Sequence, residues 1–391
     1  MPARSTHGHR PPVGRVAERV EPDREIESGA FHSVPEAPAP PARASLARLT
    51  RHLFEIGLVS AADVHRANLV ASDAGMSHAV AVVTLGDGRG FVVKELLESG
   101  DASQGSPDQE RGIYRLAARV PALATFLAPV VDLGDGGPFI VLGLQDDESV
   151  ASRVARTGWS DGQLGQFLGH ALGTWHELSR PHAADLTQLP APWILRAIGP
   201  DRPSFLLSNV HVATFLDSLD TPTLGPHLAE GAALWRSSGV VHGDLRFDNC
   251  LIDPGGRSTF VDWECAGLGD PLWDVATIVQ ELISASSARD ATACVPVLTG
   301  AARLLLEEYR ASCPSESWVD GPVRLGYYTA ARLLQRAFQL AARGRSELAD
   351  ERDRHLWLAA TLFAEPVVSD AVAAVLPAAP TAARAGVGAA A

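Results

Sequence analysis

The fold is decided by the stretch His242-Gly243-Asp244-Leu245-Arg246-Phe247-Asp248-Asn249, which continues through Cys250-Leu251-Ile252 to Phe260-Val261-Asp262-Trp263-Glu264. Apolar residues flank both polar runs, so the pattern predicts a strand, a loop that begins near Asp244, and a hairpin. The hairpin turns at Asp253-Pro254-Gly255-Gly256, which is a run of turn-forming residues. A second carboxylate, Asp262, is then expected at the end of a further strand.

The polar residues of this stretch have the types and spacing of a phosphoryl-transfer site. Asp244 can accept the proton of a substrate hydroxyl, while Asn249 can offer its amide oxygen to Mg²⁺. Asp262 can bind the metal ions that bridge the phosphates of ATP. The competing interpretation is an Asp-rich surface loop, and the apolar strands on both sides of the loop argue against it.

Lys94 is the single lysine among the 33 Lys and Arg residues of the chain. It follows two valines in Phe91-Val92-Val93-Lys94-Glu95, which is the position of the phosphate-binding lysine on the third strand of a kinase. A planar guanidinium does not replace a compact ammonium that must contact two phosphates and a glutamate. The alternative is that this one lysine has been retained by chance on an exposed strand. We interpret Lys94 as a contact to the α- and β-phosphates of ATP.

The composition excludes several classes of protein. The net charge is −13, so neither nucleic acid nor an anionic membrane is expected as a partner. No apolar run approaches the roughly 20 residues that span a bilayer, and the N-terminus lacks the apolar core of a secretory signal. The cysteines show no paired spacing and are expected to be reduced packing residues: Cys250, Cys265, Cys294 and Cys313. A cytoplasmic enzyme fits these features.

The first half of the chain predicts a small antiparallel sheet. Strands are expected at about 66–72, 78–85, 91–96, 128–133 and 138–144, with helices at 46–59 and 107–119. Gly86-Asp87-Gly88 predicts a hairpin turn between the second and third strands. The segment 72–78 occupies the place of a phosphate-covering loop, and Ser77 is its candidate nucleotide contact. With one glycine it could equally be an ordinary hairpin loop.

Two further features of this half concern the nucleotide. Glu110 lies in the first turn of the helix at 107–119 and can pair with Lys94 to hold it against the phosphates. Its alternative role is stabilisation of the helix dipole. The segment Leu142-Gly143-Leu144 is expected to form a hinge whose backbone bonds adenine, with apolar contacts from Val92 and Val141.

From residue 160 the pattern becomes helical. Apolar residues recur every three or four positions from Leu164 to Trp175, and His176 at the end of this stripe is interpreted as a packing or capping residue. Asp270 is the expected N-cap of a helix from Pro271 to Ile283. Further helices are predicted at about 222–237, 293–311, 322–342 and 350–376.

With these residues in hand, the chain resembles the aminoglycoside phosphotransferase and choline kinase-like family over about residues 55–345. The resemblance rests on His242-Gly243-Asp244, on Asn249, and on Val261-Asp262-Trp263-Glu264 with Gly269-Asp270-Pro271 and Asp274. It implies an α+β, bilobal protein kinase-like fold, with a small sheet-containing N-lobe and a larger, mainly helical C-lobe. It also implies ATP and Mg²⁺ as cofactors.

The same resemblance assigns roles and boundaries. Asp244 becomes the catalytic aspartate, Asn249 and Asp262 the metal ligands, and Asp270 and Asp274 braces of the loop. Glu264 is expected beside the metal site, beyond the ions' direct ligands. The expected organisation is a disordered extension at 1–45, an N-lobe at 46–145, a C-lobe at 146–376 and a disordered tail at 377–391.

One departure from the family lies inside the catalytic stretch. Many members have His-Pro or Asn-Pro after the leucine of this loop, where this chain has Arg246-Phe247. Arg246 could neutralise charge on the transferred phosphoryl group, and we include it among the catalytic candidates. The alternatives are an arginine that faces solvent or one that pairs with Asp248.

The acceptor hydroxyl stays open at this point. An acidic pocket would suit a cationic aminosugar or choline, whereas a Ser or Thr of a precursor peptide, followed by elimination by a partner lyase, is a second hypothesis. A nucleotide-binding pseudokinase is a third, and the complete set of Lys94, Asp244, Asn249 and Asp262 counts against it. Four residues of one predicted helix could face the acceptor or pack in the core: Tyr327, Tyr328, Arg332 and Gln335.

Overall fold

The structure is a computed structural model that describes residues 46–66, 69–73, 79–95, 107–134, 137–157, 163–200, 202–287, 291–316 and 320–364. The predicted tails, Ser77 with most of its loop, and the end of the helix predicted at 350–376 lie outside these ranges. Within them, no helix is both long and apolar enough to cross a bilayer.

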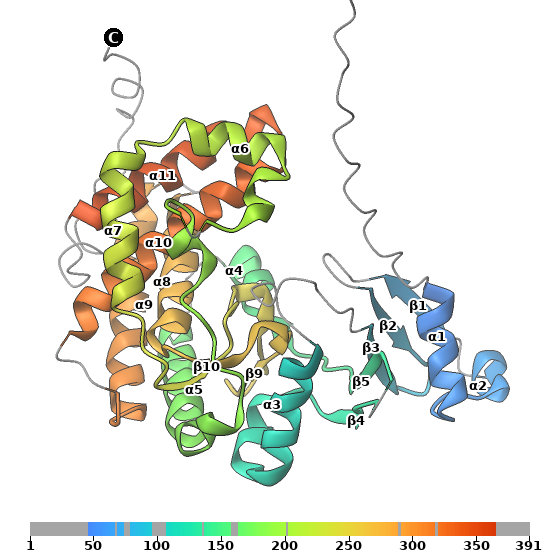
Figure 1. Ribbon diagram of the computed structural model, residues 1–391. Coiled ribbons are helices and arrows are strands. Elements are labelled where there is room, and N and C mark those ends of the chain that lie inside the picture. Colours follow the sequence, from blue (N-terminus) through green and yellow to red (C-terminus); the bar gives the residue numbers. More distant parts are fainter. Residues whose placement is uncertain are drawn as a thin grey trace, which may run out of the picture. The chain divides into compact units, whose positions relative to one another are not determined.

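A five-stranded antiparallel sheet forms the first part of the fold (Figure 1). Its order is β1-β2-β3-β5-β4, from strands β1 (Val70–Asp73), β2 (Val80–Thr84), β3 (Gly90–Glu95), β4 (Val130–Asp132) and β5 (Phe139–Gly143). Because side chains alternate between the faces of a strand, Val93 and its partner Val141 point to one face and Val92 and Leu142 to the other. The first face packs on helix α1 (Leu46–Glu55), whereas the second joins the main core.

The strands and helices predicted for this half are confirmed except at two boundaries. Helix α3 (Pro107–Arg119) has both predicted ends, and the turn between β2 and β3 places Gly88 at a φ of 91°. The helix predicted at 46–59 ends at Glu55, and a separate helix α2 (Ala61–Arg66) follows. The start of the first strand at 66 is therefore wrong. Ser60 and Asp63 form a reciprocal cap that begins α2, since each side chain accepts the backbone N–H of the other.

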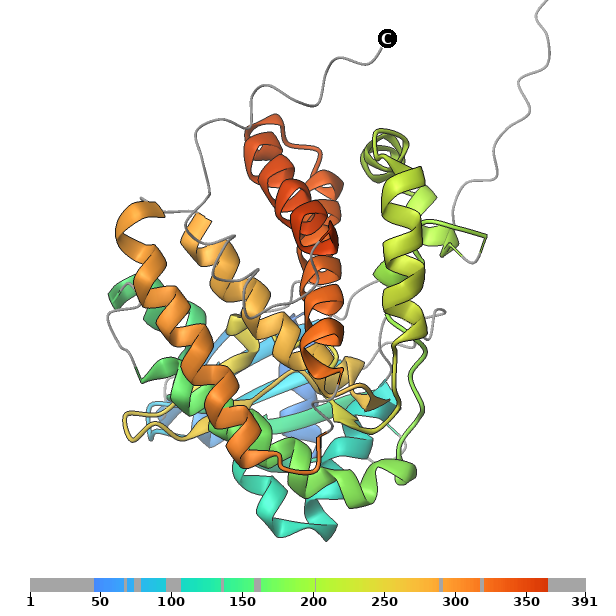
Figure 2. The same cartoon turned by 90° about the vertical axis from the view of Figure 1, so that its left-hand side faces the viewer.

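The remainder is mainly helical. Its helices are α4 (Val150–Thr157), α5 (Leu164–Ser179), α6 (Val210–Asp217), α7 (Thr221–Ala233), α8 (Leu272–Ser287), α9 (Ala291–Ser312), α10 (Gly321–Ala342) and α11 (Ala349–Ala364). Helix α10 packs against both α8 and α11 (Figure 2). The helix predicted at 222–237 ends four residues early. Helices α4 and α6, each of eight residues, have no counterpart among the predictions.

Short strands frame the catalytic stretch. Strand β7 (Gly239–Val241) pairs with β10 (Gly267–Gly269), and β8 (Cys250–Ile252) lies between β6 (Glu148–Ser149) and β9 (Ser258–Phe260). The predicted hairpin is confirmed, with the β8–β9 turn closed by a hydrogen bond from Asp253 N to the Arg257 carbonyl. We call residues 242–249, between β7 and β8, the catalytic loop, after the role that the sequence predicts for Asp244. Its two ends are fixed by separate sheets.

Candidate active site

The catalytic loop is held in place by a buried carboxylate. Asp274, on α8, accepts hydrogen bonds from the backbone N–H groups of His242 (2.7 Å) and Gly243 (3.0 Å). It also contacts His176 Nε2 at 3.2 Å, and the side chains of Asp274 and His176 lie away from solvent. His176 packs as predicted, between Asp274 and the Tyr309 hydroxyl. Asp274 thus braces the loop, as the resemblance implied.

Gly243 is required where the loop begins. Its φ is 83°, a conformation that other residues rarely adopt, and a Cβ there would collide with the carbonyl oxygen of Cys265. Asp270 supports the next element. It accepts from Leu272 N at 3.1 Å at the start of α8, as expected of a cap, and it is paired with the buried Arg324 at 2.8 Å. The loop and α8 are therefore tied together by buried hydrogen bonds.

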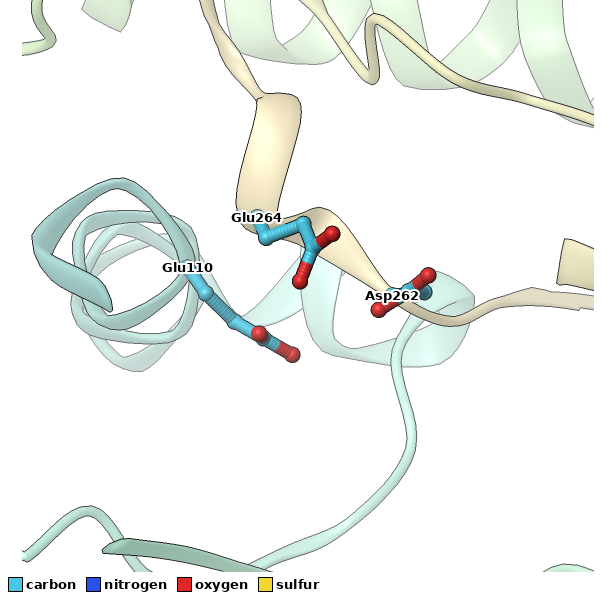
Figure 3. A group of neighbouring side chains, drawn as sticks. All are labelled: Glu110, Asp262 and Glu264. Carbon is cyan, nitrogen blue, oxygen red and sulfur yellow. The ribbon is translucent and has the colours of Figure 1, made fainter. Parts of the chain in front are cut away.

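Lys94 lies among three carboxylates. Its Nζ is 2.8 Å from Glu110 Oε2 and 3.0 Å from Glu264 Oε2, and it also forms an ion pair with Asp262. Figure 3 shows the three carboxylates converging from α3 and from the segment after β9. One oxygen atom of each lies within 4.8 Å of the others. Lys94 is only 5% exposed. The predicted Lys94–Glu110 pair is confirmed, and Glu264 contacts the same ammonium.

The charges in this cluster depend on one another. Burial alone would lower the pKa of Lys94, but the Glu110, Asp262 and Glu264 carboxylates raise it well above its usual range. Burial raises the pKa of Glu110, and the Lys94 ammonium opposes that shift. The three carboxylates therefore favour the protonated, positively charged form of Lys94. A metal ion at the centre of the three carboxylates would compete with that cation.

Asn249 and Asp262 have the donor chemistry of a magnesium site. The Asn249 side chain donates from Nδ2 to the Asp244 carbonyl at 2.9 Å, so its hard oxygen donor is not the atom used in that bond. Asp262 has a φ of 70°, and it is the only non-glycine residue with positive φ in the described ranges. Its side chain is 35% exposed. These two residues fit Mg²⁺, which favours oxygen ligands and retains several waters.

Two arginines donate hydrogen bonds to the Asp244 carboxylate. Arg246 Nε donates to Oδ2 at 3.0 Å, and Arg332 Nη2, from α10, donates to Oδ1 at 3.1 Å. The alternative that Arg246 pairs with Asp248 is therefore wrong, because its guanidinium turns back to the aspartate two residues earlier. Arg332 also lies over the ring of Trp273, with 5.4 Å between Cζ and the centroid. The sequence named Arg332 only as one of four possibilities.

A cavity of about 330 Å³ opens beside Asp244. Of the four residues proposed on α10, Arg332 and Gln335 line it, whereas the Tyr328 hydroxyl bonds Asp270 and the Tyr327 hydroxyl bonds Glu230. The lining residues are Gln109, Leu189, Pro190, Ala191, Pro192, Trp193, Arg196, Phe205, Trp235, Val241, Gly243, Asp244, Cys265, Trp273, Arg332, Gln335 and Gln339. The sequence alone offered no indication that the segment 189–205 lies beside Asp244.

The predicted adenine contacts require one correction. Val141 is buried on the α1 face of the sheet, so it cannot share a surface with Val92; the residue beside Val92 is Leu142. The hinge amides are also engaged by backbone carbonyls, since Gly143 N donates to the Pro129 carbonyl and Leu144 N to the Gly90 carbonyl. Nucleotide contact by Val92, Leu142 and Leu144 stays a prediction, and Ser77 lies outside the described residues.

Comparisons with known proteins match the chain to a family model and to a curated protein. A family model described as "Phosphotransferase enzyme family" matches residues 68–311. Protein LicA of Haemophilus influenzae is 45% identical over 49 residues, which is 12% of this chain and 18% of that protein. The matched segment is thus less than a fifth of that relative's length.

Two solved structures resemble the fold. Amicoumacin kinase hAmiN, in complex with AMP-PNP, Ca²⁺ and Ami, has a TM-score of 0.50 at 13% identity, with 80% of this chain and 92% of that chain covered. Glucosamine kinase also has a TM-score of 0.50, at 18% identity, with 71% and 74% covered. At such identities the likeness concerns the fold alone.

Proposed function

This chain belongs to the phosphotransferase enzyme family, and from that premise we propose that it transfers the γ-phosphoryl group of ATP to a hydroxyl group of a small molecule. The observation that carries the proposal is the position of Asp244. It lines the cavity, and its loop also supplies Asn249. A cytoplasmic location, where ATP is abundant, fits this activity.

The chemistry follows from the contacts of Asp244. The acceptor oxygen bonds to the γ-phosphorus as the bond from that phosphorus to the bridging oxygen of ADP breaks, and the acceptor proton passes to the Asp244 carboxylate. Each carboxylate oxygen has two lone pairs, so the arginine contacts leave room for that proton. Mg²⁺ held by Asn249 and Asp262 would neutralise phosphate charge. Lys94, fixed by Glu110, would hold the α- and β-phosphates.

Arg246 and Arg332 act on the same aspartate. They fix the direction of its carboxylate, which matters because proton transfer requires the base within hydrogen-bond distance of the hydroxyl. Their positive charges would also oppose the negative charge that develops on the transferred phosphoryl group. Arg246 therefore combines the predicted electrostatic role with a positioning role.

The test is Asp244→Asn, assayed by ATP-dependent phosphorylation of a panel of hydroxyl compounds. We expect turnover to fall by about 10²–10⁴-fold, the usual contribution of a general base, with ATP binding retained. Asp248→Asn is the matched control, since Asp248 is exposed on the same loop. Retained turnover in Asp244→Asn would contradict the assignment.

The two other hypotheses are outcomes of the same experiment. If the phosphate appears on Ser or Thr of a precursor peptide, as mass spectrometry would show, the acceptor is a peptide and a lyase partner is expected. If ATP binds but no acceptor is phosphorylated, the protein is a nucleotide-binding module. The cavity volume of about 330 Å³ favours the small molecule, because it lies at the small end of the usual range for such sites.

A further inference from the structure

The wall of the cavity beside Asp244 has an unusual charge distribution for a pocket expected to hold a cationic acceptor. Its charged lining residues are Arg196, Arg332 and Asp244, so two positive charges face one negative charge. Asp244 is the only carboxylate among the described residues that line it. Four large aromatic side chains complete the wall: Trp193, Phe205, Trp235 and Trp273.

The single carboxylate is already matched by positive charge. Both oxygens of Asp244 accept from guanidinium groups, those of Arg246 and Arg332. Glu281 lies near Arg332 but does not line the cavity, and burial raises the pKa of its carboxyl against the opposing charges of the neighbouring arginines. A cationic acceptor would thus meet two guanidiniums and no unmatched carboxylate.

Both lining arginines keep donors for a ligand. Arg332 is only 3% exposed; its Nη1 donates to Gln335 and its Nη2 to Asp244, while its buried Nε has no hydrogen-bond partner in the described part of the chain. Arg196 uses Nε to bond the Ala191 carbonyl at 3.2 Å, and it forms no salt bridge with any described residue. A guanidinium carries five N–H donors, so Nη hydrogens of Arg196 and Arg332 remain for the oxygens of a ligand in the cavity.

We infer that the acceptor is a hydroxylated carboxylic acid with a flat apolar or aromatic part. This inference rests on the proposed phosphoryl transfer to a hydroxyl and names the class of its acceptor. The carboxylate pairs with Arg196 and Arg332, whose planar forks match its two oxygens. The flat part lies against the aromatic wall, where Trp193 and Phe205 pack edge to face with centroids 5.6 Å apart. One negative charge balances the net positive charge of the lining.

The experiment uses three matched alcohols that differ in charge: 3-hydroxy-3-phenylpropanoate, its neutral amide, and 3-amino-1-phenylpropan-1-ol. Binding to the full chain is measured by calorimetry with saturating ADP and Mg²⁺. ADP fills the nucleotide site without a γ-phosphate, which would otherwise compete with the carboxylate for the arginines. We expect the Kd of the carboxylate to be at least about tenfold lower than the Kd of the ammonium compound. A difference of this size corresponds to the contribution of one hydrogen bond to a charged group. Equal binding, tighter binding of the ammonium compound, or no binding of the carboxylate overturns the inference.

Substitutions of Arg196 test where the preference for a carboxylate over its amide arises. Arg196→Gln should remove most of the difference between the carboxylate and the amide, whereas Arg196→Lys should retain more of it because the positive charge stays. Arg202→Gln is the control, since Arg202 is exposed in the same region of the chain. A carboxylate preference that is unchanged in Arg196→Gln would place the anion elsewhere and overturn the assignment.

Turnover separates this inference from the proposed function. Preferential binding of carboxylates without phosphorylation of any hydroxyl compound would leave the anion site standing and defeat the phosphotransferase proposal. Phosphorylation confined to aminoalcohols or aminosugars would support phosphoryl transfer and overturn the anionic acceptor. Phosphorylation of hydroxy acids in preference to their amides would support both.

Discussion

Lys94 is the residue at which three separate parts of the chain meet. Strand β3 supplies the ammonium, α3 supplies Glu110, and the segment after β9 supplies Asp262 and Glu264. An ammonium can approach three carboxylates at once because it is compact and carries three donors on a rotatable stem. This geometry gives a physical reason for one lysine in a chain that otherwise uses arginine.

At this scale we predict that Lys94→Arg inactivates the protein although the charge is conserved. The guanidinium is larger and planar, and the site is only 5% exposed. Phosphorylation rates should fall by about 10²–10³-fold, which is typical for loss of a preorganised electrostatic contact. Steady-state kinetics with varied ATP measures the loss. An active Lys94→Arg would show that the charge alone suffices.

Arg332 provides a second prediction at the residue scale. Arg332→Gln should lower kcat about tenfold to a hundredfold, because Asp244 loses a charged hydrogen bond that fixes it. The KM for ATP should change little, since Arg332 lines the cavity that we propose for the acceptor. Arg332→Lys, which keeps the charge but loses the fork, should lie between. A normal kcat in Arg332→Gln would exclude a positioning role.

Helices α5 and α9 approach closely because of a glycine stripe. Gly165, Gly169 and Gly173 recur every four residues on α5, and a Cβ at the first two would collide with the carbonyl oxygens of Ala301 and Leu305. Such a repeat places all three glycines on one helix face. Helix α5 also carries His176, which contacts Asp274, so this packing supports the catalytic loop.

At the scale of elements, Gly169→Ala should destabilise the protein. The added methyl group meets backbone, which cannot move aside, and overpacking typically costs about 1–3 kcal/mol. Gly300→Ala on α9 is the matched control, because a Cβ there meets nothing within 4 Å. That change should be neutral or stabilising, as alanine favours a helix. Thermal unfolding of both variants measures the difference, and equal melting temperatures would refute close packing at Gly169.

Across the whole molecule, a buried histidine links α11 to α8. His355 Nδ1 lies 2.7 Å from the Glu351 carbonyl, which can only accept, so this nitrogen carries the proton. Nε2 lies 2.8 Å from the Ser284 hydroxyl on α8. Burial lowers the pKa of His355 below its usual 6.5, and the charge of Arg336 acts in the same direction. The folded state therefore favours the neutral form of the His355 ring.

This linkage predicts loss of stability in acid. Because the folded pKa lies below the unfolded one, the contribution of His355 is complete above pH 6.5 and declines as the pH falls through the folded value, by at most about 1.4 kcal/mol per pH unit. Urea unfolding at pH 7.5 and 5.5 should show a smaller loss in His355→Gln than in the unmodified protein. His65→Gln, at an exposed position on α2, is the control. Equal losses in the two variants would contradict the linkage.

Local features of this fold could be predicted because neighbouring residues encode them. The ends of α3, the β2–β3 turn and the β8–β9 hairpin follow from turn chemistry and periodicity. Helices α4 and α6 were missed because eight residues hold barely two turns, too few for a periodic pattern. Val141 was placed on the wrong face because hydrophobicity alone does not distinguish the two sides of a strand buried on both.

The order of residues along the chain was enough to predict the chemistry of the stretch from His242 to Glu264, since those residues lie within or beside single elements. It left two roles open for Glu110, and the fold decided for the ion pair with Lys94. Folding in three dimensions was needed to establish that Arg332 contacts Asp244 across 88 residues of chain and that Arg196 lines the same cavity. Such contacts depend on how α10 and the segment 189–205 pack, which no local pattern specifies. The charge of the cavity beside Asp244 is therefore a property of the folded molecule.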